Sequence, residues 1–333
     1  MLLVSGDVVR RTGGNLYDRH MERACRRAGV PLRIVSVAST AQARSLLARA
    51  KPRVVVIDSI AITVAAPLVP WIREELRARI VVLMHMPTGA RGARGVLRAA
   101  DKVVAVSPDL ARTLERAGVP RSRLTVIPPG SDGIPRLARG DRRARYRGQL
   151  RVLAVANWSS PKGIATLVSA AAHVPIVRLD LVGDTGTGGY RDRVYALIKS
   201  HGLESRVAVH GALGERALAR RYADADVFAL PTQREGYGIV FAEALMRGLP
   251  VVAADIAAVR AILGDAGVFV PPQRVRPLAA ALRLMTDSWL RRRLAKTARA
   301  RARALPGWSA SQAAFIALVR SEMHAVAVAV ARS

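Results

Sequence analysis

The feature that most limits how this chain can fold is a repeated alternation of short apolar runs with amphipathic stretches. In the first half, runs such as Val54–Ile57 and Val103–Val106 are built almost wholly from Val and Ile. Candidate helices such as Asn15–Arg27 and Pro108–Ala117 lie between these runs. Strands of a parallel sheet are continuous apolar runs because helices cover both faces of the sheet. The pattern therefore predicts an α/β domain with a parallel sheet.

The same alternation starts again after a charged interruption. Residues 136–149 have no periodicity and many arginines, which is typical of a linker. Apolar runs resume at Val152–Ala156 and continue to Val268–Val270. A length of 333 residues suits two hydrophobic cores better than one. We expect an N-terminal domain, a basic linker, a C-terminal domain and a helical tail that packs back on the first domain: 1–135, 136–149, 150–305 and 306–333.

Neither a membrane span nor a disulfide framework is expected. The longest apolar candidate, Val54–Ile72, contains Asp58, Pro67 and Pro70, so we predict a strand followed by a loop there. The first residues lack the charged start and long apolar stretch of a signal peptide. The single cysteine, Cys25, fits a reducing compartment. The expected location is the cytoplasm.

The net charge of +29 is distributed unevenly. Residues 1–150 hold 28 basic and 11 acidic residues, a net +17, and the remainder holds 25 and 13, a net +12. Such a surface suits an anionic membrane or a nucleic acid. Only five of the 53 basic residues are lysines, so an arginine-rich composition bias is the alternative explanation. No second feature of a nucleic-acid binder accompanies the charge, and no specific nucleic-acid partner is expected.

Two carboxylates in residues 231–254 mark the strongest candidate site. Glu235 and Glu243 have seven residues between them, and the turn Gly236-Tyr237-Gly238 follows the first. An apolar run precedes this turn, and a helix that begins near Ile239 follows it. A helix N-terminus presents free N–H groups and a positive dipole end, which suit a phosphate. The alternative is a surface loop with two solvated glutamates.

This stretch resembles the Glu-x7-Glu signature of retaining GT-B-fold glycosyltransferases of family 4. The resemblance runs from Thr12-Gly13-Gly14 to Trp308-Ser309. It implies two Rossmann-like parallel-sheet domains facing across a cleft, and sugar transfer from a nucleoside-diphosphate sugar with retention at the anomeric carbon. No cofactor and no metal are implied.

The resemblance also assigns roles to residues of the second half. Lys162 and the backbone N–H groups of 236–239 would stabilise the departing diphosphate. Glu235 would hold the donor's ring hydroxyls, and Glu243 would anchor its ribose. Relatives carry an arginine five or six residues before the lysine, where this chain has Ala156 or Asn157. We therefore expect one cationic contact to be absent there or to be supplied from elsewhere.

Further candidates follow apolar runs in both halves. Gly13 and Gly14 would border the donor phosphates and the acceptor, and His85 would hydrogen-bond a hydroxyl of the donor sugar. Gly183 and Asp184 begin a glycine-rich loop that would line the nucleotide site. The pair Asp224 and Asp226 resembles a metal-binding motif of another glycosyltransferase fold. Its place between a helix and a buried strand argues against metal binding.

The expected function is a retaining glycosyltransferase whose acceptor is a lipid-linked or cell-envelope glycan. The enzyme would then associate peripherally with the inner face of the plasma membrane. Three alternatives stay open: a soluble transferase acting on a small molecule, an epimerase or phosphorylase of the same architecture, and a basic nucleic-acid-binding protein.

Overall fold

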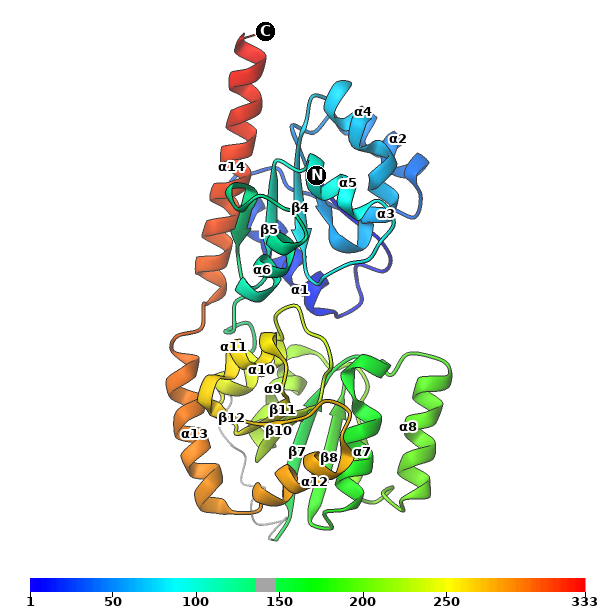
Figure 1. Ribbon diagram of the computed structural model, residues 1–333, viewed down its shortest axis with the longest axis vertical. Helices are drawn as coiled ribbons and strands as arrows, with labels where there is room; N and C mark the ends of the chain where they lie inside the picture. The colour runs from blue at the N-terminus through cyan, green and yellow to red at the C-terminus, as the bar shows by residue number, and fades with distance from the viewer. Residues whose placement is uncertain (136–147, 333) are drawn as a thin grey trace. The chain divides into compact units, whose positions relative to one another are not determined.

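The computed structural model describes residues 1–135 and 148–332, with side chains up to 328. The chain forms two compact units, residues 1–130 with 307–333, and residues 131–306. Most of the predicted linker, 136–149, lies outside the described residues; Gly148 and Gln149 directly precede a strand. In Figure 1 the strands of each unit lie among helices.

The first unit is built on a six-stranded parallel sheet with the order β2-β1-β3-β4-β5-β6. Its strands are β1 (Leu2–Val4), β2 (Ile34–Ser36), β3 (Val54–Asp58), β4 (Arg79–Met84), β5 (Lys102–Ala105) and β6 (Leu124–Val126). Its α-helices are α1 (Gly13–Arg27), α2 (Thr40–Ala50), α3 (Ile62–Ala65), α4 (Val69–Glu74), α5 (Ala93–Ala99), α6 (Pro108–Arg116) and α14 (Trp308–Arg332). Short 3₁₀ turns are η1 (Ser59–Ala61), η2 (Ala66–Leu68) and η3 (Arg121–Arg123).

The second unit has a parallel sheet of the same size with the order β12-β11-β10-β7-β8-β9. Its strands are β7 (Leu150–Val155), β8 (Val177–Val182), β9 (Val207–Val209), β10 (Val227–Leu230), β11 (Val251–Ala254) and β12 (Gly267–Val270). Its α-helices are α7 (Ile164–Ala172), α8 (Gly189–Ser200), α9 (Glu215–Asp224), α10 (Ile239–Met246), α11 (Ala257–Leu263), α12 (Val275–Leu284) and α13 (Ser288–Ala302). Two 3₁₀ turns are η5 (Ser160–Lys162) and η6 (Gly264–Ala266).

The local sequence explains where the main helices begin. The Thr12 side chain accepts a hydrogen bond from the N–H of Asn15 and caps α1, which begins at Gly13, two residues before the predicted start. Ser107 caps α6, and Pro108 occupies the first turn, where a missing N–H costs nothing. Every residue of β3 is buried, as expected for an inner strand covered on both faces.

The predicted loop after β3 is wrong in one respect, because residues 59–74 form short helical turns. Pro67 lies in the first turn of η2, and Pro70 lies in the first turn of α4. A proline breaks a helix from its interior but fits its first turn. The two prolines therefore divide the segment into short helices rather than prevent helix formation.

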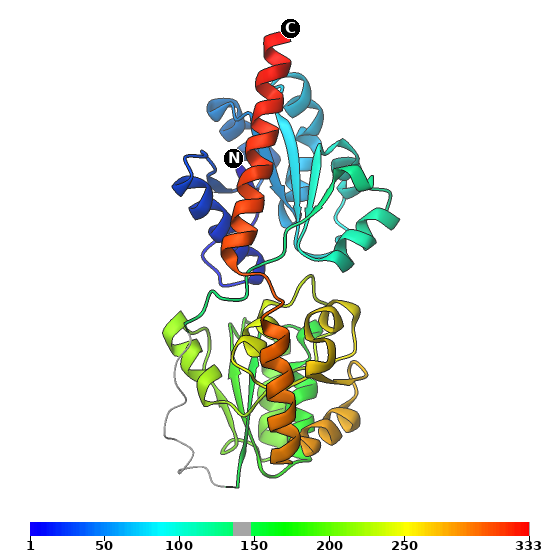
Figure 2. The same cartoon turned by 90° about the vertical axis from the view of Figure 1, so that its left-hand side faces the viewer.

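The last helix, α14, belongs to the first unit. Its first residue, Trp308, stacks on the ring of His20 with centroids 3.7 Å apart and planes within 5°. Farther along, Glu322 is 3% exposed and accepts from Nε of Arg79 at 2.7 Å. Figure 2 shows α14 running along one face of the first sheet, where it packs against α1, β3 and β4. Within the described residues, no helix is both long enough and apolar enough to cross a membrane.

Candidate active site

The carboxyl ends of β3 and β4 bring His85 next to two buried acids in the first unit. His85 follows β4, Asp58 is the last residue of β3, and Asp18 lies in the second turn of α1. Nε2 of His85 lies 3.2 Å from Oδ1 of Asp18 and 3.1 Å from Oδ2 of Asp58. The Asp18 and Asp58 side chains are only 2% and 1% exposed. We refer to Asp18, Asp58 and His85 as the Asp–His–Asp cluster.

Gly14 of the predicted donor loop lies against this cluster. A β-carbon placed on Gly14 would lie 3.1 Å from Cδ2 of the His85 ring, closer than most side chains tolerate. Gly13 and Gly14 are the first two residues of α1, so they stand where the helix presents its free N–H groups. The structure thus brings together Gly14 and His85, which the sequence analysis had selected separately.

The charges of the Asp–His–Asp cluster depend on one another. Burial raises the pKa of Asp18 to about 7, and the nearby Asp58 carboxylate adds to this rise. Burial also acts to raise the pKa of Asp58, but the neighbouring His85 outweighs it and lowers that pKa. Burial acts to lower the pKa of His85, whereas its hydrogen bonds with Asp18 and Asp58 raise it to about 10.

The same three residues are the one group among the described residues that could hold a metal ion. Each offers one ligand atom, and these atoms lie within 4.8 Å of one another. The sequence did not predict this group, because the three residues are far apart along the chain. The pair Asp224 and Asp226 has other contacts: Oδ2 of Asp226 accepts from the N–H of Arg151, and Asp224 lies 3.9 Å from the guanidinium of that arginine.

In the second unit, the loops after β7 and β10 place Lys162 beside Glu235. Nζ of Lys162 lies 2.6 Å from Oε1 of Glu235, and the two side chains are 28% and 9% exposed. The carbonyl of Pro161 accepts from the N–H of Gln233 at 2.7 Å, which ties one loop to the other. Gly163, with φ of 72°, lies so close to Pro231 that a β-carbon would be 2.5 Å from the Pro231 oxygen. These contacts hold the ion pair in place.

The Gly-Tyr-Gly turn leads directly into α10. Gly238 precedes the helix with φ of 95°, and a β-carbon there would lie 2.8 Å from the Phe241 ring. Ile239 is the first helical residue, so the free N–H groups of α10 follow Glu235 by only a few residues. Tyr237 is 9% exposed, and burial raises its pKa to about 12. Its hydroxyl has no hydrogen-bond partner within the described part of the chain.

Glu243 is a buried residue of α10 with a partner on α9. It is 5% exposed, and its Oε2 accepts a 2.7 Å hydrogen bond from the hydroxyl of Tyr222. Burial raises the pKa of Tyr222, with a further contribution from the Glu243 carboxylate. Sequence reasoning missed Tyr222, because nothing in the spacing of 222 and 243 pairs a residue of one helix with a residue of the next.

Asn157, Gly183 and Asp184 join the loops after β7 and β8. Oδ1 of Asn157 accepts from the N–H of Asp184 at 3.0 Å. The Gly183 N–H donates to the carbonyl of Gly211, and a β-carbon on Gly183 would lie 2.0 Å from the oxygen of Ala156. Asn157, one of the two positions where the resemblance predicts an arginine, therefore links two loops in this chain.

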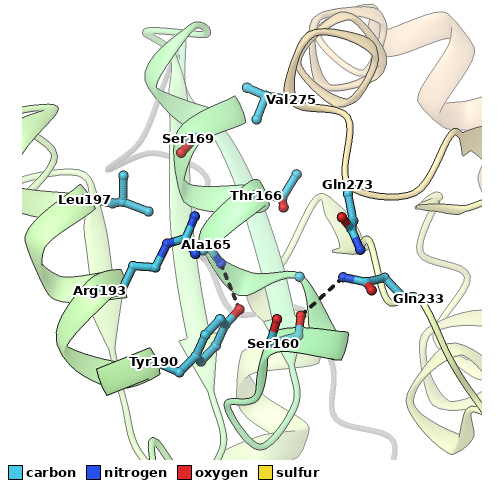
Figure 3. A pocket seen from close by; sticks show the side chains of 11 residues that line it. Ser160, Ala165, Thr166, Ser169, Tyr190, Arg193, Leu197, Gln233, Gln273 and Val275 are labelled. Atoms are coloured by element: carbon cyan, nitrogen blue, oxygen red, sulfur yellow. Dashed lines mark hydrogen bonds between the residues drawn. The ribbon is translucent and has the colours of Figure 1, made fainter. Parts of the chain in front are cut away.

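A cavity of about 280 Å³ borders this region. Its lining residues include Ser160 and Gln233, which are close in sequence to Lys162 and Glu235, and Tyr190 and Arg193 of α8 (Figure 3). The Tyr190 hydroxyl accepts from the N–H of Ala165 in the first turn of α7. Lys162, Glu235 and Glu243 are not among its lining residues, so the cavity adjoins the candidate site without containing the predicted chemistry.

The sequence of the chain is similar to those of known glycosyltransferases. A family model of the group 1 glycosyl transferases matches residues 141–301, and one of Glycosyltransferase Family 4 matches residues 7–132. A D-inositol 3-phosphate glycosyltransferase of Xylanimonas cellulosilytica is 34% identical over 244 residues, which cover 68% of this chain and 58% of that protein. One of Kineococcus radiotolerans is 33% identical over 258 residues, covering 69% and 59%. The chain thus spans less than two thirds of the length of these curated relatives.

Solved structures show the same fold. A sucrose-phosphate synthase from Thermosynechococcus elongatus superimposes with a TM-score of 0.81 at 21% identity, covering 97% of this chain and 99% of that one. Anabaena Alr3699/HepE, solved in complex with UDP-glucose, superimposes with a TM-score of 0.79 at 19% identity. The match covers 96% of this chain and 99% of that one. The two parallel-sheet units therefore form the GT-B fold. The chain belongs to glycosyltransferase family 4, the group 1 glycosyl transferases, which confirms the predicted fold and family.

Proposed function

We propose that this glycosyltransferase moves a sugar from a nucleoside-diphosphate sugar to its acceptor with retention at the anomeric carbon. The ion pair of Lys162 and Glu235 next to the start of α10 carries the proposal. An ammonium group and free helix N–H groups that lie close together would stabilise the negative charge that a diphosphate gains on leaving. Glu235 would hold the ring hydroxyls of the sugar and favour the positive charge that develops on it.

The donor to test first carries UDP, because the structurally similar HepE is described in complex with UDP and with UDP-glucose. Purified protein is incubated with UDP-sugars and D-inositol 3-phosphate, and the anomer of the product is read by NMR. A product with the donor's anomeric configuration supports the proposal. A product of inverted configuration contradicts it.

We propose further that the acceptor is anionic. The first 150 residues carry a net +17, and similar proteins are named for D-inositol 3-phosphate, which bears a phosphate. A lipid-linked acceptor at an anionic cytoplasmic membrane surface would also present negative charge. Each basic residue near such a surface adds about 1 kcal/mol of attraction. Sedimentation with anionic and with neutral vesicles distinguishes a lipid-linked acceptor from a small phosphorylated one. Binding to anionic vesicles favours a lipid-linked acceptor, whereas no binding even at low salt favours a small phosphorylated one.

The Lys162→Ala variant is expected to bind UDP roughly 10- to 100-fold more weakly and to bind uridine unchanged. The reason is that a charge-assisted hydrogen bond to the diphosphate, of about 1.5–3 kcal/mol, is lost while the nucleoside contacts remain. Isothermal titration of both ligands measures the difference. Lys162→Arg keeps the charge, and the exposed Lys199→Ala serves as a control in the same unit. Equal loss for UDP and uridine would assign Lys162 a structural role.

The Glu243→Ala variant is expected to raise the KM for the donor more than it lowers kcat, because a ribose contact is alike in ground and transition states. It is also expected to destabilise the second unit by about 1–3 kcal/mol, since the buried Tyr222 hydroxyl loses its 2.7 Å hydrogen bond to a charged acceptor and keeps only the Val240 carbonyl at 3.3 Å. Steady-state kinetics and urea unfolding measure the two effects.

Glu243→Gln is the matched variant, because its amide oxygen can still accept from Tyr222. In a Tyr222→Phe background, the stability loss caused by Glu243→Ala should become smaller. An unchanged KM in Glu243→Ala would remove the ribose assignment and leave Glu243 with its packing role alone.

A further inference from the structure

Exposed apolar side chains of the first unit lie at one edge of its sheet. In the described part of this unit, the large apolar residues that are more than a third exposed are Val9, Ile60, Met86, Val126 and Val328. Val9 follows β1, Ile60 follows β3, Met86 follows β4, and Val126 ends β6. Four of the five therefore lie at the carboxyl edge of the sheet, where open α/β sheets bind ligands.

The second unit has a different pattern. Its exposed large apolar residues, among those that the structure describes, are Ile176, Tyr195, Leu284 and Trp289. The first directly precedes β8, and the other three lie in the helices α8, α12 and α13. None of them lies in a loop that follows a strand, whereas Lys162 and Glu235 do. Exposed apolar side chains thus accompany the site residues of the first unit and not those of the second.

Ile60 and Met86 lie next to each other beside the Asp–His–Asp cluster. The N–H of His85 donates to the hydroxyl oxygen of Ser59 at 3.4 Å, and Ile60 and Met86 directly follow these two bonded residues. The strands β3 and β4 are paired up to their last residues, so the two loops leave the sheet about 4.8 Å apart. Ile60 is 53% exposed and Met86 is 39% exposed.

The helix α1 holds Val9 near the same cluster. Nδ2 of Asn15 donates to the carbonyls of Asp7 and Arg10 at 2.9 and 2.8 Å, which fixes the loop on both sides of Val9. The preceding residue of the helix, Gly14, lies against the histidine ring of the cluster. Ordering a loop costs conformational entropy, and a valine that is 75% exposed returns little of this cost by burial.

We call Val9, Ile60 and Met86 the apolar rim. A single exposed apolar side chain needs no explanation, but several of them beside one site indicate a binding surface. Exposed basic residues follow two members of the rim along the chain: Arg10, Arg11, Arg91 and Arg94. Such a surface suits an amphiphile, because its hydrocarbon part leaves water and its anionic part is attracted by the guanidinium groups.

We propose that the apolar rim is an acceptor subsite for a hydrocarbon chain, and that the acceptor is an amphiphile with an anionic head. The inference rests on the proposed function, in which the acceptor is anionic, and it selects the lipid-linked source. The head would lie beside His85, and the chain would cover the rim. A purely polar sugar phosphate would leave the three apolar side chains in water.

The test is NMR of the full chain with ¹³C-labelled methionine methyl groups. The chain has seven methionines, and the signal missing from Met86→Leu identifies Met86. The probes are methyl phosphate and octyl phosphate, which share an anionic head and differ in their chains. Octyl phosphate, kept below its micelle concentration, is expected to shift the Met86 signal with a Kd at least about tenfold lower than that of methyl phosphate.

The expected ratio follows from the burial of the chain. A factor of ten corresponds to about 1.4 kcal/mol, which is the transfer of roughly two methylene groups out of water. The buried Met285 of the second unit is the internal reference, and its signal should stay in place. Equal Kd values for the two phosphates, or no shift of the Met86 signal with octyl phosphate, overturn the inference.

Two variants test whether the rim itself contacts the chain. Val9→Ser and Ile60→Ser should each raise the Kd of octyl phosphate about three- to tenfold and leave that of methyl phosphate unchanged. Both positions are exposed, so neither change should unfold the protein. The matched control is Ile176→Ser, an exposed isoleucine of the other unit. An unchanged Kd in both variants would mean adventitious binding of an amphiphile, and equal weakening of both probes would mean a structural role; either result overturns the inference.

The outcome for the subsite is separate from the outcome for the proposed function. A wild-type chain that binds octyl phosphate as expected but binds no UDP would count against the proposed function and leave the hydrocarbon subsite in place. A chain that binds UDP and transfers a sugar to D-inositol 3-phosphate, yet binds the two phosphates equally, would keep the proposed function and overturn the subsite.

Discussion

Replacing Glu235 with glutamine is expected to lower kcat at least about tenfold, which is roughly 1.4 kcal/mol of activation free energy. The carboxylate lies 2.6 Å from the ammonium of Lys162 and just before the first turn of α10. Its charge is the group that can favour positive charge on the sugar as the diphosphate leaves, and a neutral amide cannot replace that charge. Steady-state rates with a saturating donor measure the effect.

The glutamine variant should leave folding and UDP binding nearly unchanged. Its amide oxygen can still accept from Lys162, and partly exposed ion pairs contribute only about 0–1 kcal/mol to stability. The exposed Glu204→Gln is the control for loss of one negative charge in the same unit. Full activity in Glu235→Gln would remove this residue from catalysis. A large loss of UDP affinity would show that it acts through the position of Lys162.

The sequence predicted the sheets well because buried parallel strands need no information beyond their own apolar runs. The run Val54–Ile57 became β3, one residue longer, and Val103–Val106 became β5 within one residue at each end. The first helix was predicted to begin at Asn15 and begins two residues earlier, at Gly13. The short helices within 59–74 were missed, because proline was taken as a sign of a loop although Pro67 and Pro70 each lie in the first turn of a helix, where proline is tolerated.

The contacts between site residues could not be predicted, because they depend on which strands become neighbours. Lys162 and Glu235 were both selected, yet their ion pair requires β7 to lie next to β10. Asp58 was treated only as an argument against a membrane span. One signal was available: Asp58 and His85 each directly follow an apolar strand, and β3 and β4 are adjacent in the sheet. Polar residues that end consecutive strands of one parallel sheet meet at the same edge.

The Gly183→Ala variant is expected to destabilise the second unit by roughly 2–6 kcal/mol. The residue has φ of 138°, and the added β-carbon would lie 2.0 Å from the oxygen of Ala156. A positive φ in a residue with a β-carbon costs about 1–3 kcal/mol, and a steric clash in a packed region costs about 1–3 kcal/mol more. Neither loop can yield easily, since the N–H of Asp184 is bound to Asn157 and the N–H of Trp158 donates to the carbonyl of Asp184.

Gly186 in the same loop provides the control that separates strain from collision. It has φ of 64°, but a β-carbon there would have no neighbour within 4 Å. Gly186→Ala should therefore cost only about 1–2 kcal/mol, the penalty of a left-handed conformation. Amide hydrogen exchange of β7 and β8 measures the local opening free energy, and β3 and β4 of the other unit serve as an internal reference. Similar losses in both variants would mean that Gly183 is required for its conformation alone. A clearly larger loss in Gly183→Ala would show that close contact between the β7 and β8 loops holds this end of the sheet together.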